Sequence, residues 1–445
     1  MRRFLLMLLL LVPAPLTAQE DTLRIPTGVR LGLVYRPVYQ PKVAVRPFSG
    51  PGELAEVATA ILRRDLEYSD RFELAEAPER LARGPVDYKP WNALGVVYLV
   101  TGGLEPTGDR TQLRITLHDV VYGTIKQSQS FTLPPLDAAD FRMALHAAAD
   151  EVVRWLTGQP GMAASRVAFI RRRGDGGYEV MVVDSDGEGA QVVHSSANIL
   201  LSPAWSPDGR RLAYALAHAS GWSIQERDLE SGQVQLVSGR PGLNTTPSYA
   251  PDGRRLAFAL SSGSGTEIYD YDVAQRCCLR RLTNGPRDDL SPSFSPDGKQ
   301  LAFNSNRLGQ PHIYLMPAEG GEPTLLSPFV YGEPGYYTSP DWAPEGTLIA
   351  FHGRSRGEFQ LMVADAANAG GTVQQLTQEG ASEDPSWAPD GRHVVFSGVR
   401  AGGSGLYVMD AVSGRTRPLV LGGRYLVPDW SPTLLRASAL AVRGP

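Results

Sequence analysis

The stretch SPAWSPDGRRLAYA, residues 202–215, decides the fold because close copies of it recur along the chain. TPSYAPDGRRLAFA begins at Thr246, and SPSFSPDGKQLAFN begins at Ser291. In each copy a Pro-Asp-Gly turn follows a short strand: Pro fixes φ at the first corner, Asp accepts local backbone hydrogen bonds, and Gly supplies a positive φ. Six copies of the wider pattern have anchor prolines 44, 45, 48, 45 and 43 residues apart, at Pro207, Pro251, Pro296, Pro344, Pro389 and Pro432. Asp or Glu and then Gly follow the first five of these prolines.

Each period holds four short apolar strands, which is typical of a β-propeller blade. The strand RVAFI at 166–170 has no first strand before it, and VPDWSP at 427–432 has no second strand after it. Because these two strands complete one another, we predict a six-bladed β-propeller over residues 166–432, closed by pairing of its last strand with the first blade. An open stack of repeats is the alternative.

An aromatic residue stands at a fixed place before each anchor proline, and we predict that it packs between neighbouring blades. A carbohydrate-binding platform is the alternative use of the tryptophans among them. The six residues are Trp205, Tyr249, Phe294, Trp342, Trp387 and Trp430.

The part of the chain before the repeats predicts an α/β domain with the element order β-α-β-α-β-β-β-α. Apolar residues recur at helical spacing between Pro51 and Leu66. A second long helix is expected to begin after Asp137 or Asp140 and to end at Gly158. The predicted divisions are a signal peptide (1–18), an extended N-terminal arm (19–41), the α/β domain (42–157), a linker (158–165), the propeller (166–432) and a C-terminal tail (433–445).

The first residues indicate export. Arg2 and Arg3 precede an apolar run from Phe4 to Val12, and small residues follow, so we expect a secretory signal peptide cleaved after Ala18. An uncleaved membrane anchor is the alternative, but the apolar run is shorter than the roughly 20 residues that span a bilayer. No other segment approaches that length, so we expect a soluble exported protein without direct membrane insertion.

No set of residues in the chain predicts catalysis or metal binding. Lys and Arg are scattered and the net charge is −4, which argues against nucleic acid as a partner. There is no nucleophile elbow or phosphate loop, and the histidines lack ligand spacing. We expect DSDGEG, at 184–189, to be a hairpin turn rather than a calcium loop. The adjacent Cys277 and Cys278 are expected to form no disulfide, because neighbouring side chains on a strand point to opposite faces. We therefore expect no enzyme, no cofactor and no metal.

The unrepeated loops before the innermost strands are the candidate binding surface, because variable loops on a rigid frame usually carry specificity. The longest of them, VYGEPGYYTSP, contains Tyr331, Tyr336 and Tyr337. Tyrosines with Gly and polar neighbours suit a protein interface, although they could equally fold the loop onto its neighbours. The candidate partner-binding residues are Leu200, Leu243, Asn244, Thr245, Asp289, Leu290, Tyr331, Glu333, Tyr336, Tyr337, Glu383, Arg424 and Tyr425.

The order of signal peptide, α/β domain and six Pro-Asp-Gly blades resembles the TolB family, the periplasmic propeller proteins of the Tol–Pal envelope system. The family's blade start appears here as LLSPAWSPDG at 200–209, and its closing segment appears as PDWSP at 428–432. The resemblance implies a periplasmic, non-catalytic scaffold of envelope integrity and cell division. Its propeller would bind a Pal-like peptidoglycan-associated lipoprotein on the loops named above.

The resemblance also implies that the N-terminal arm binds a TolA-like inner-membrane protein. Residues that match the family's arm pattern are Glu20, Leu23, Arg24, Ile25, Thr27, Gly28 and Val29. The following RLGLVYRPVYQ is longer than the family's usual link, and Leu243 replaces a frequent His before Asn244. Two alternatives stay open: a propeller that binds a sugar or small ligand in its central opening, and a relative of propeller peptidases without a hydrolase domain. We expect a monomer.

Overall fold

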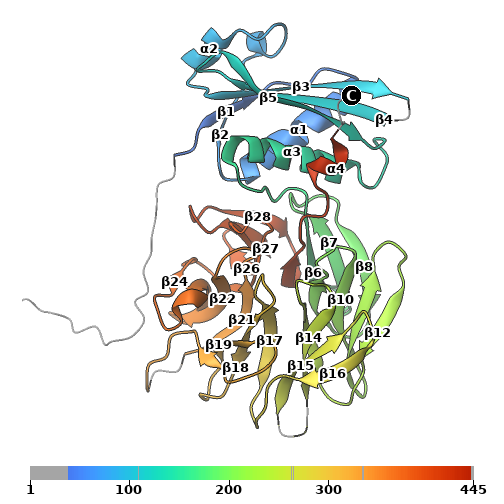
Figure 1. Cartoon of the computed structure of the whole chain (residues 1–445), viewed down its shortest axis with the longest axis vertical. Coiled ribbons are helices and arrows are strands. Elements are labelled where there is room, and N and C mark those ends of the chain that lie inside the picture. The colour runs from blue at the N-terminus through green and yellow to red at the C-terminus, as the bar shows by residue number, and fades with distance from the viewer. Residues whose placement is uncertain (1–38, 109, 262, 264, 333–334, 442–445) are drawn as a thin grey trace, which may run out of the picture.

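The structure, a computed structural model, describes residues 39–108, 110–261, 263, 265–332 and 335–441. It contains a mixed α/β domain and a β-propeller, and α1 and α3 lie between the sheet of the first and the body of the second (Figure 1). The predicted signal peptide and nearly all of the predicted arm, residues 1–38, lie outside the described residues.

The α/β domain has the element order that the sequence predicts. Its sheet runs in the order β2-β1-β3-β4-β5, with β1 parallel to β2 and β3, and with β3, β4 and β5 antiparallel. The elements are β1 (Lys42–Val45), α1 (Gly52–Tyr68), β2 (Glu73–Ala75), α2 (Tyr88–Ala93), β3 (Tyr98–Thr107), β4 (Arg110–Asp119), β5 (Thr124–Leu133) and α3 (Phe141–Thr157).

The two long helices cover one face of this sheet with their apolar sides. Ile61, Leu62 and Leu66 of α1 share a buried cluster with Val152 of α3 and with residues of the sheet. Gly158 ends α3 in the left-handed conformation, with a φ of 73°, where glycine meets no steric cost. The predicted helix end is therefore confirmed.

Six four-stranded antiparallel sheets form the propeller, and the predicted closure is confirmed because β29 pairs with β6. Blade 1 contains β29 (Arg424–Trp430), β6 (Arg166–Arg172), β7 (Tyr178–Asp184) and β8 (Gln191–Ser196); blade 2 contains β9 (Leu200–Trp205), β10 (Arg211–His218), β11 (Gly221–Asp228) and β12 (Val234–Ser238); blade 3 contains β13 (Asn244–Tyr249), β14 (Arg255–Ser261), β15 (Thr266–Asp272) and β16 (Cys277–Arg281).

The remaining blades follow the same meander, with short fourth strands in blades 4 and 5. Blade 4 contains β17 (Asp289–Phe294), β18 (Gln300–Ser305), β19 (His312–Pro317) and β20 (Thr324–Leu325); blade 5 contains β21 (Tyr337–Trp342), β22 (Leu348–Ser355), β23 (Glu358–Asp365) and β24 (Gln374–Gln375); blade 6 contains β25 (Ser382–Trp387), β26 (His393–Arg400), β27 (Gly403–Asp410) and β28 (Thr416–Leu421).

The repeated aromatic residues are core residues between blades, as the sequence predicts. Trp205 packs with Ile170 of blade 1 and Leu212 of blade 2, and Trp430 packs with Val395 of blade 6 and Phe169 of blade 1. At four of the six contacts between blades, the residue that stands between the repeated proline and the repeated aromatic also makes a hydrogen bond to the next blade. Its side chain accepts a hydrogen bond from the backbone N–H of the next blade's aromatic, in the pairs Asp429–Trp205, Ser293–Trp342, Asp341–Trp387 and Ser386–Trp430.

A β-bulge interrupts every innermost strand just before its repeated proline. The residue before the proline has a left-handed φ of 43–52° in all six blades, although none of the six is glycine. Because the same bulge recurs in every blade, it bends each inner strand in the same way and is a regular feature of this propeller, not a local defect. The six residues are Ser202, Thr246, Ser291, Ser339, Asp384 and Val427.

The segment after the propeller returns to the α/β domain, which the sequence did not predict. A short helix, α4 (Ala437–Leu440), packs on α3, and Ala437 is buried in the same cluster as the α1 and α3 side chains. The residues from 424 to 440 thus close the propeller and cover the other domain.

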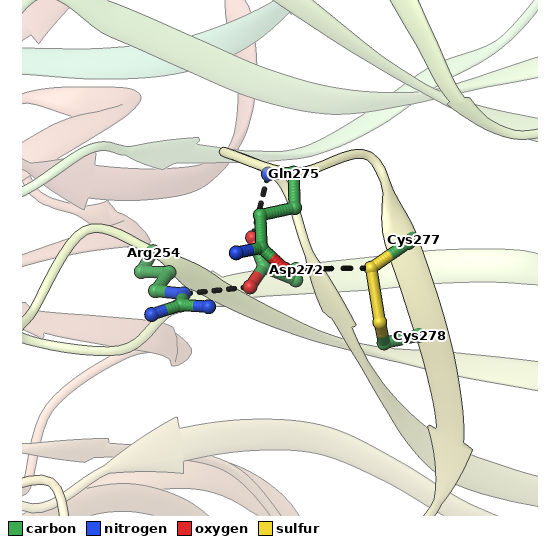
Figure 2. Close-up of a disulfide and its surroundings, with 5 residues drawn as sticks. All are labelled: Arg254, Asp272, Gln275, Cys277 and Cys278. Atoms are coloured by element: carbon green, nitrogen blue, oxygen red, sulfur yellow. Dashed lines mark hydrogen bonds and ion pairs between the residues drawn. A yellow bond between two sulfur atoms is a disulfide. The ribbon is translucent and has the colours of Figure 1, made fainter.

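The expectation that Cys277 and Cys278 form no disulfide is wrong. Their sulfur atoms are bonded to one another on β16, as Figure 2 shows. The expectation assumed a regular strand with alternating side chains, but Cys278 has a left-handed φ of 64°. That backbone departure brings both side chains to one side of the strand.

Candidate protein-binding surface

The two ends of the propeller differ because its strands run back and forth. The Pro-Asp-Gly turns and the turns between third and fourth strands, such as 185–190 and 411–415, lie at the end that faces the α/β domain, and we call this end the domain face. The opposite end, the loop face, is formed by the connections between second and third strands and by the segments leading into the inner strands: 197–199, 239–243, 282–288, 326–332, 335–336, 376–381 and 422–423.

One buried charge cluster joins the α/β domain to blade 6 on the domain face. Asp70, just after α1, accepts a hydrogen bond at 3.0 Å from Arg415, and its carboxylate lies 3.2 Å from Nε2 of His393. Nδ1 of His393 lies 2.8 Å from Asp390. Burial alone would lower the pKa of His393, but the Asp390, Asp70 and Asp410 carboxylates raise it to about 9. His393 is therefore an imidazolium at neutral pH and holds one carboxylate from each domain.

A second cluster joins the α/β domain to blade 1. Asp186, in the turn after β7, is bound by Arg64 of α1 and by Arg142 of α3, the latter at 2.7 Å. Nδ1 of His146, on α3, lies 2.7 Å from a carboxylate oxygen of Asp65, and its Nε2 lies 3.7 Å from Asp186. Burial would lower the pKa of His146, but the Asp65, Asp186 and Asp184 carboxylates raise it.

The ligand atoms of Asp65, His146 and Asp186 lie within 4.8 Å of one another, close enough to hold a metal ion. Two guanidinium groups already bind the Asp186 carboxylate and supply its counter-charge. The chemistry of the donor set therefore fits an ion-pair network between domains better than a cation site. The sequence predicted only a hairpin at 184–189, because a contact between distant elements leaves no local pattern.

The loop face carries exposed apolar side chains that the α/β domain does not cover. Phe329, Val330 and Tyr331 follow one another in the long loop, and Tyr331 is 94% exposed. Other exposed apolar residues lie on connections or strand ends at this end of the propeller, namely Ile199, Leu308, Val399 and Leu421. Exposed apolar side chains with aromatic members gathered at one end of a molecule are typical of a protein-binding surface.

The predicted contact residues fall into three groups by exposure. Tyr331 and Arg424 are exposed, and Leu243, Leu290, Tyr336, Tyr337, Glu383 and Tyr425 are half-buried. Leu200, Asn244, Thr245 and Asp289 are buried. Glu333 lies outside the described residues.

The buried members of the predicted set support the loops from within. Leu200 packs in the cluster between blades 1 and 2. Asn244 donates hydrogen bonds to the carbonyl groups of Trp222 and Arg240, and Asp289 accepts one from Arg307 at 3.1 Å. In this conformation, the surface available to a partner comes from the exposed and half-buried residues.

The tyrosines of the long loop divide between the two roles that the sequence left open. The ring of Tyr337 packs edge-on against Phe351, and that of Tyr336 lies 5.5 Å from Phe359. These two fold the loop onto the blade. Tyr331 is almost fully exposed and is free to contact a partner. Its neighbours Phe329 and Val330 are the residues that sequence reasoning missed, and their place in the unrepeated loop was the available signal.

The central opening holds a narrow hollow of about 260 Å³ lined by the bulged inner strands. This volume is below the roughly 300–1,000 Å³ of most small-molecule sites. Burial raises the pKa of Asp341 to about 6, and burial with the neighbouring Asp341 carboxylate raises the pKa of Asp429 to about 8. Both carboxylates also accept backbone hydrogen bonds between blades, so their geometry is accounted for by the ring itself.

The predicted arm residues Glu20, Leu23, Arg24, Ile25, Thr27, Gly28 and Val29 lie outside the described residues. Within the part of the chain that the structure describes, no helix has both the length and the apolar character needed to cross a membrane.

Comparison with known proteins identifies both domains. Residues 37–125 match the family model of the TolB amino-terminal domain, and residues 153–434 match that of the TolB β-propeller domain. The Tol-Pal system protein TolB of Methylococcus capsulatus is 34% identical over 232 residues, which are 51% of this chain and 52% of that protein. The TolB of Thioalkalivibrio sulfidiphilus is 34% identical over 244 residues, 52% of this chain and 53% of that protein.

The match to these curated relatives spans about half of their length, whereas a solved structure is similar over nearly the whole chain. The crystal structure of TolB from Acinetobacter baumannii aligns with a TM-score of 0.78 and 28% identity, and the alignment covers 91% of this chain and 100% of that one. Two matching domains in the same order, over most of the described fold, show that the chain belongs to the TolB family, a family of non-enzymatic proteins.

Proposed function

We propose that this protein is a periplasmic scaffold of a Tol–Pal system, which binds a Pal-like lipoprotein through the loop face and a TolA-like inner-membrane protein through its N-terminal arm. The observation that carries the proposal is the exposed apolar run Phe329–Tyr331 on an end of the propeller that the α/β domain leaves uncovered. Family membership supports the choice of partners, since the named relatives are Tol-Pal system proteins.

The shape of the loop face suits a partner protein better than a small ligand. Its exposed apolar residues are spread over several blades, so a single partner contacts many of them only if it covers the end of the ring. Interfaces of this kind bury roughly 800 Å² per partner and depend on a few aromatic anchors. Tyr331 is the exposed aromatic residue best placed for that role.

Titration of the purified full-length mature chain with a Pal-like lipoprotein, lacking its lipid, tests the first part. Tyr331→Ala is expected to weaken binding by about tenfold, which is typical of an interface hot spot. Tyr122→Ala is the matched control, because Tyr122 is 80% exposed but lies in the α/β domain, beyond the propeller. Equal affinities of wild type and Tyr331→Ala would argue against the loop face as the docking surface.

Deletion of residues 19–29 tests the second part. Binding of a TolA-like domain is expected to disappear, whereas binding of the Pal-like lipoprotein and the melting temperature should stay near those of the undeleted chain. Retained binding of the TolA-like domain after the deletion would rule out the arm as its docking segment.

A further inference from the structure

We propose that the Cys277–Cys278 disulfide is a thiol–disulfide exchange site that accepts electrons from a dithiol protein and thereby changes the pairing of β16 in blade 3. The proposal is independent of partner binding at the loop face, because the pair begins β16 directly after the turn between third and fourth strands, at the opposite end of the blade.

The pair is accessible to a second protein. β16 is the outermost strand of blade 3, and Cys278 is exposed. Cys278 also lines an open hollow of about 430 Å³ with Arg254, Arg280 and Glu319. Exposed disulfides are the ones that exchange readily with thiols, whereas buried structural ones do not.

The disulfide is coupled to the backbone of β16. Bonding adjacent cysteines closes a small ring that includes the peptide between them, and Cys278 is left-handed within it, with a φ of 64°. Arg276, just before the pair, is also left-handed, with a φ of 53°. Non-glycine residues adopt this conformation only when their surroundings hold them there.

The pairing of β16 with β15 departs from regular register at this place. Asp270 pairs with Arg280 and Asp272 pairs with Cys277, so β16 uses one more residue than β15 between the two pairs. The fourth strands of blades 2 and 6 have their irregularities farther from the turn, at Ile224/Gln225 and Leu406/Tyr407. The bulge in the fourth strand of blade 3 therefore lies at the disulfide, nearer to the turn than the bulges of blades 2 and 6.

The strand transmits this change to the next blade through Arg280. Its guanidinium donates to Asp270 at 2.8 Å within blade 3 and to Glu319, in the turn after β19 of blade 4. Arg255 donates to the same Glu319 at 2.9 Å. Once the ring opens, Cys278 is free to become extended, and because only Leu279 separates it from Arg280, the Arg280 side chain shifts with it.

The exchange needs only a dithiol as reductant. A donor thiolate attacks Sγ of Cys278, a new S–S bond forms, and Cys277 leaves as a thiolate that takes up a proton. The donor's second thiol then attacks the mixed disulfide, and Cys278 leaves in the same way. Two electrons pass to the pair, which ends as two thiols, while the donor ends as a disulfide. Figure 2 shows Asp272 and Gln275 on one side of Cys277, and Sγ of Cys277 lies 3.7 Å from Oε1 of Gln275.

A trapping experiment on the full-length mature chain tests the exchange. The oxidised protein, purified without reductant, is expected to take up no maleimide and to form a mixed disulfide with a reduced thioredoxin-fold protein whose second active-site cysteine is replaced by serine. Cys277→Ser/Cys278→Ser, in which both sulfurs are absent, should form no such adduct. Maleimide uptake before reduction, or failure to trap an adduct with the native protein, would overturn the proposal.

Amide hydrogen exchange of the same samples tests the coupling to the strand. Reduction by a phosphine is expected to speed exchange within residues 277–283, and the double serine variant should exchange like the reduced protein. Residues 416–421 of β28, the equivalent strand in blade 6, serve as the internal control and should not change. Equal exchange of residues 277–283 in the oxidised and reduced forms would contradict the change in β16.

Discussion

The domain face and the loop face are the two ends of the same strands, but they carry different side chains: charged groups in contact with the other domain at one end, and exposed apolar groups at the other. On the domain face, buried histidines and carboxylates and partly exposed arginines join blades 1 and 6 to α1, α3 and the residue Asp70 after α1. On the loop face, exposed apolar side chains stand on unrepeated loops, and Tyr331 has almost no cover. The fold thus places its costly buried charges at the contact between the domains, and it leaves exposed apolar residues at the end that we propose as the docking surface.

The largest expected effect comes from Asp70→Ala, because it removes the carboxylate between His393 and Arg415. Breaking a buried ion pair by removing one partner costs about 3–5 kcal/mol, so denaturant unfolding should show a clear loss of stability or separate transitions for the two domains. Asp70→Asn is the informative companion, since Asn tolerates the left-handed φ of 53° at this position but lacks the charge. Asp175→Ala, an exposed carboxylate at the loop face, is the control and should change little. If Asp70→Ala unfolded at the same denaturant concentration as the wild type, this cluster would not be what holds the domains together.

Alkaline pH should weaken the same joint by a smaller amount. The pKa of His393 is raised from 6.5 to about 9 in the folded protein, so its contribution is full below pH 6.5 and is lost as the pH rises through about 9. That contribution is at most about 3 kcal/mol. Unfolding free energies measured at pH 6 and pH 10 should therefore differ more in wild type than in His393→Gln. A pH dependence that is the same in both proteins would contradict a raised pKa at this histidine.

Removing a polar contact between two blades should destabilise the protein less than removing Asp70. Asp429→Ala leaves the backbone N–H of Trp205 without its acceptor at 2.7 Å, which costs about 1–3 kcal/mol. Asp429→Asn should be nearly neutral at pH 7, because the pKa of about 8 means that the carboxyl group is already uncharged there. Melting temperatures of the wild type, Asp429→Asn and Asp429→Ala, measured by thermal unfolding at pH 7, give their order of stability. An Asn variant as unstable as the Ala variant would mean that charge, and not hydrogen bonding, matters at this joint.

The smallest expected effect on stability is that of Tyr331→Ala, within about 0.5 kcal/mol of wild type, as for most exposed positions. Tyr337→Ala is the contrasting change, because the Tyr337 ring packs against Phe351 of its own blade and against His312 of blade 4. Melting temperatures should separate the two variants, with Tyr337→Ala clearly the lower. Similar losses in both would mean that the loop face is as tightly packed as the domain face.

The repeated pattern made the propeller predictable. Six anchor prolines gave the blade count, and two unpaired strands gave the closure of β29 onto β6. Both inferences rest on local chemistry, namely turn residues and strand alternation, which a sequence displays directly. The same holds for the element order of the α/β domain and for the helix end at Gly158.

The contacts between domains could not be predicted in that way. Asp70 and His393 are 323 residues apart, and each reads as an ordinary surface residue in its own segment. The turn at 184–189 likewise matched a plain hairpin, although Asp184 and Asp186 join the domains. The disulfide was missed because the argument assumed a regular strand, and a single left-handed residue invalidates that assumption.

The predicted contact residues lie in or beside the unrepeated loops at one end of the propeller, but the sequence was less informative about individual side chains. A residue just before an inner strand can turn outward, as Tyr331 does, or inward, as Asn244 does. The sequence shows which positions lie in unrepeated loops, but only the packing shows which of them reach the surface.

The pairing of β29 with β6 that closes the ring also determines when each domain can finish folding. β6 begins at Arg166, whose N–H bonds to the Ser431 hydroxyl 265 positions later, and α4 covers α3 only after that point. During synthesis, neither domain is complete until residues 424–440 have been made. Until then the first blade keeps an open edge, and the helices keep an uncovered apolar patch. A chain interrupted anywhere in the propeller should therefore be open to chaperones and proteases, because it lacks the strand pairing that closes the ring.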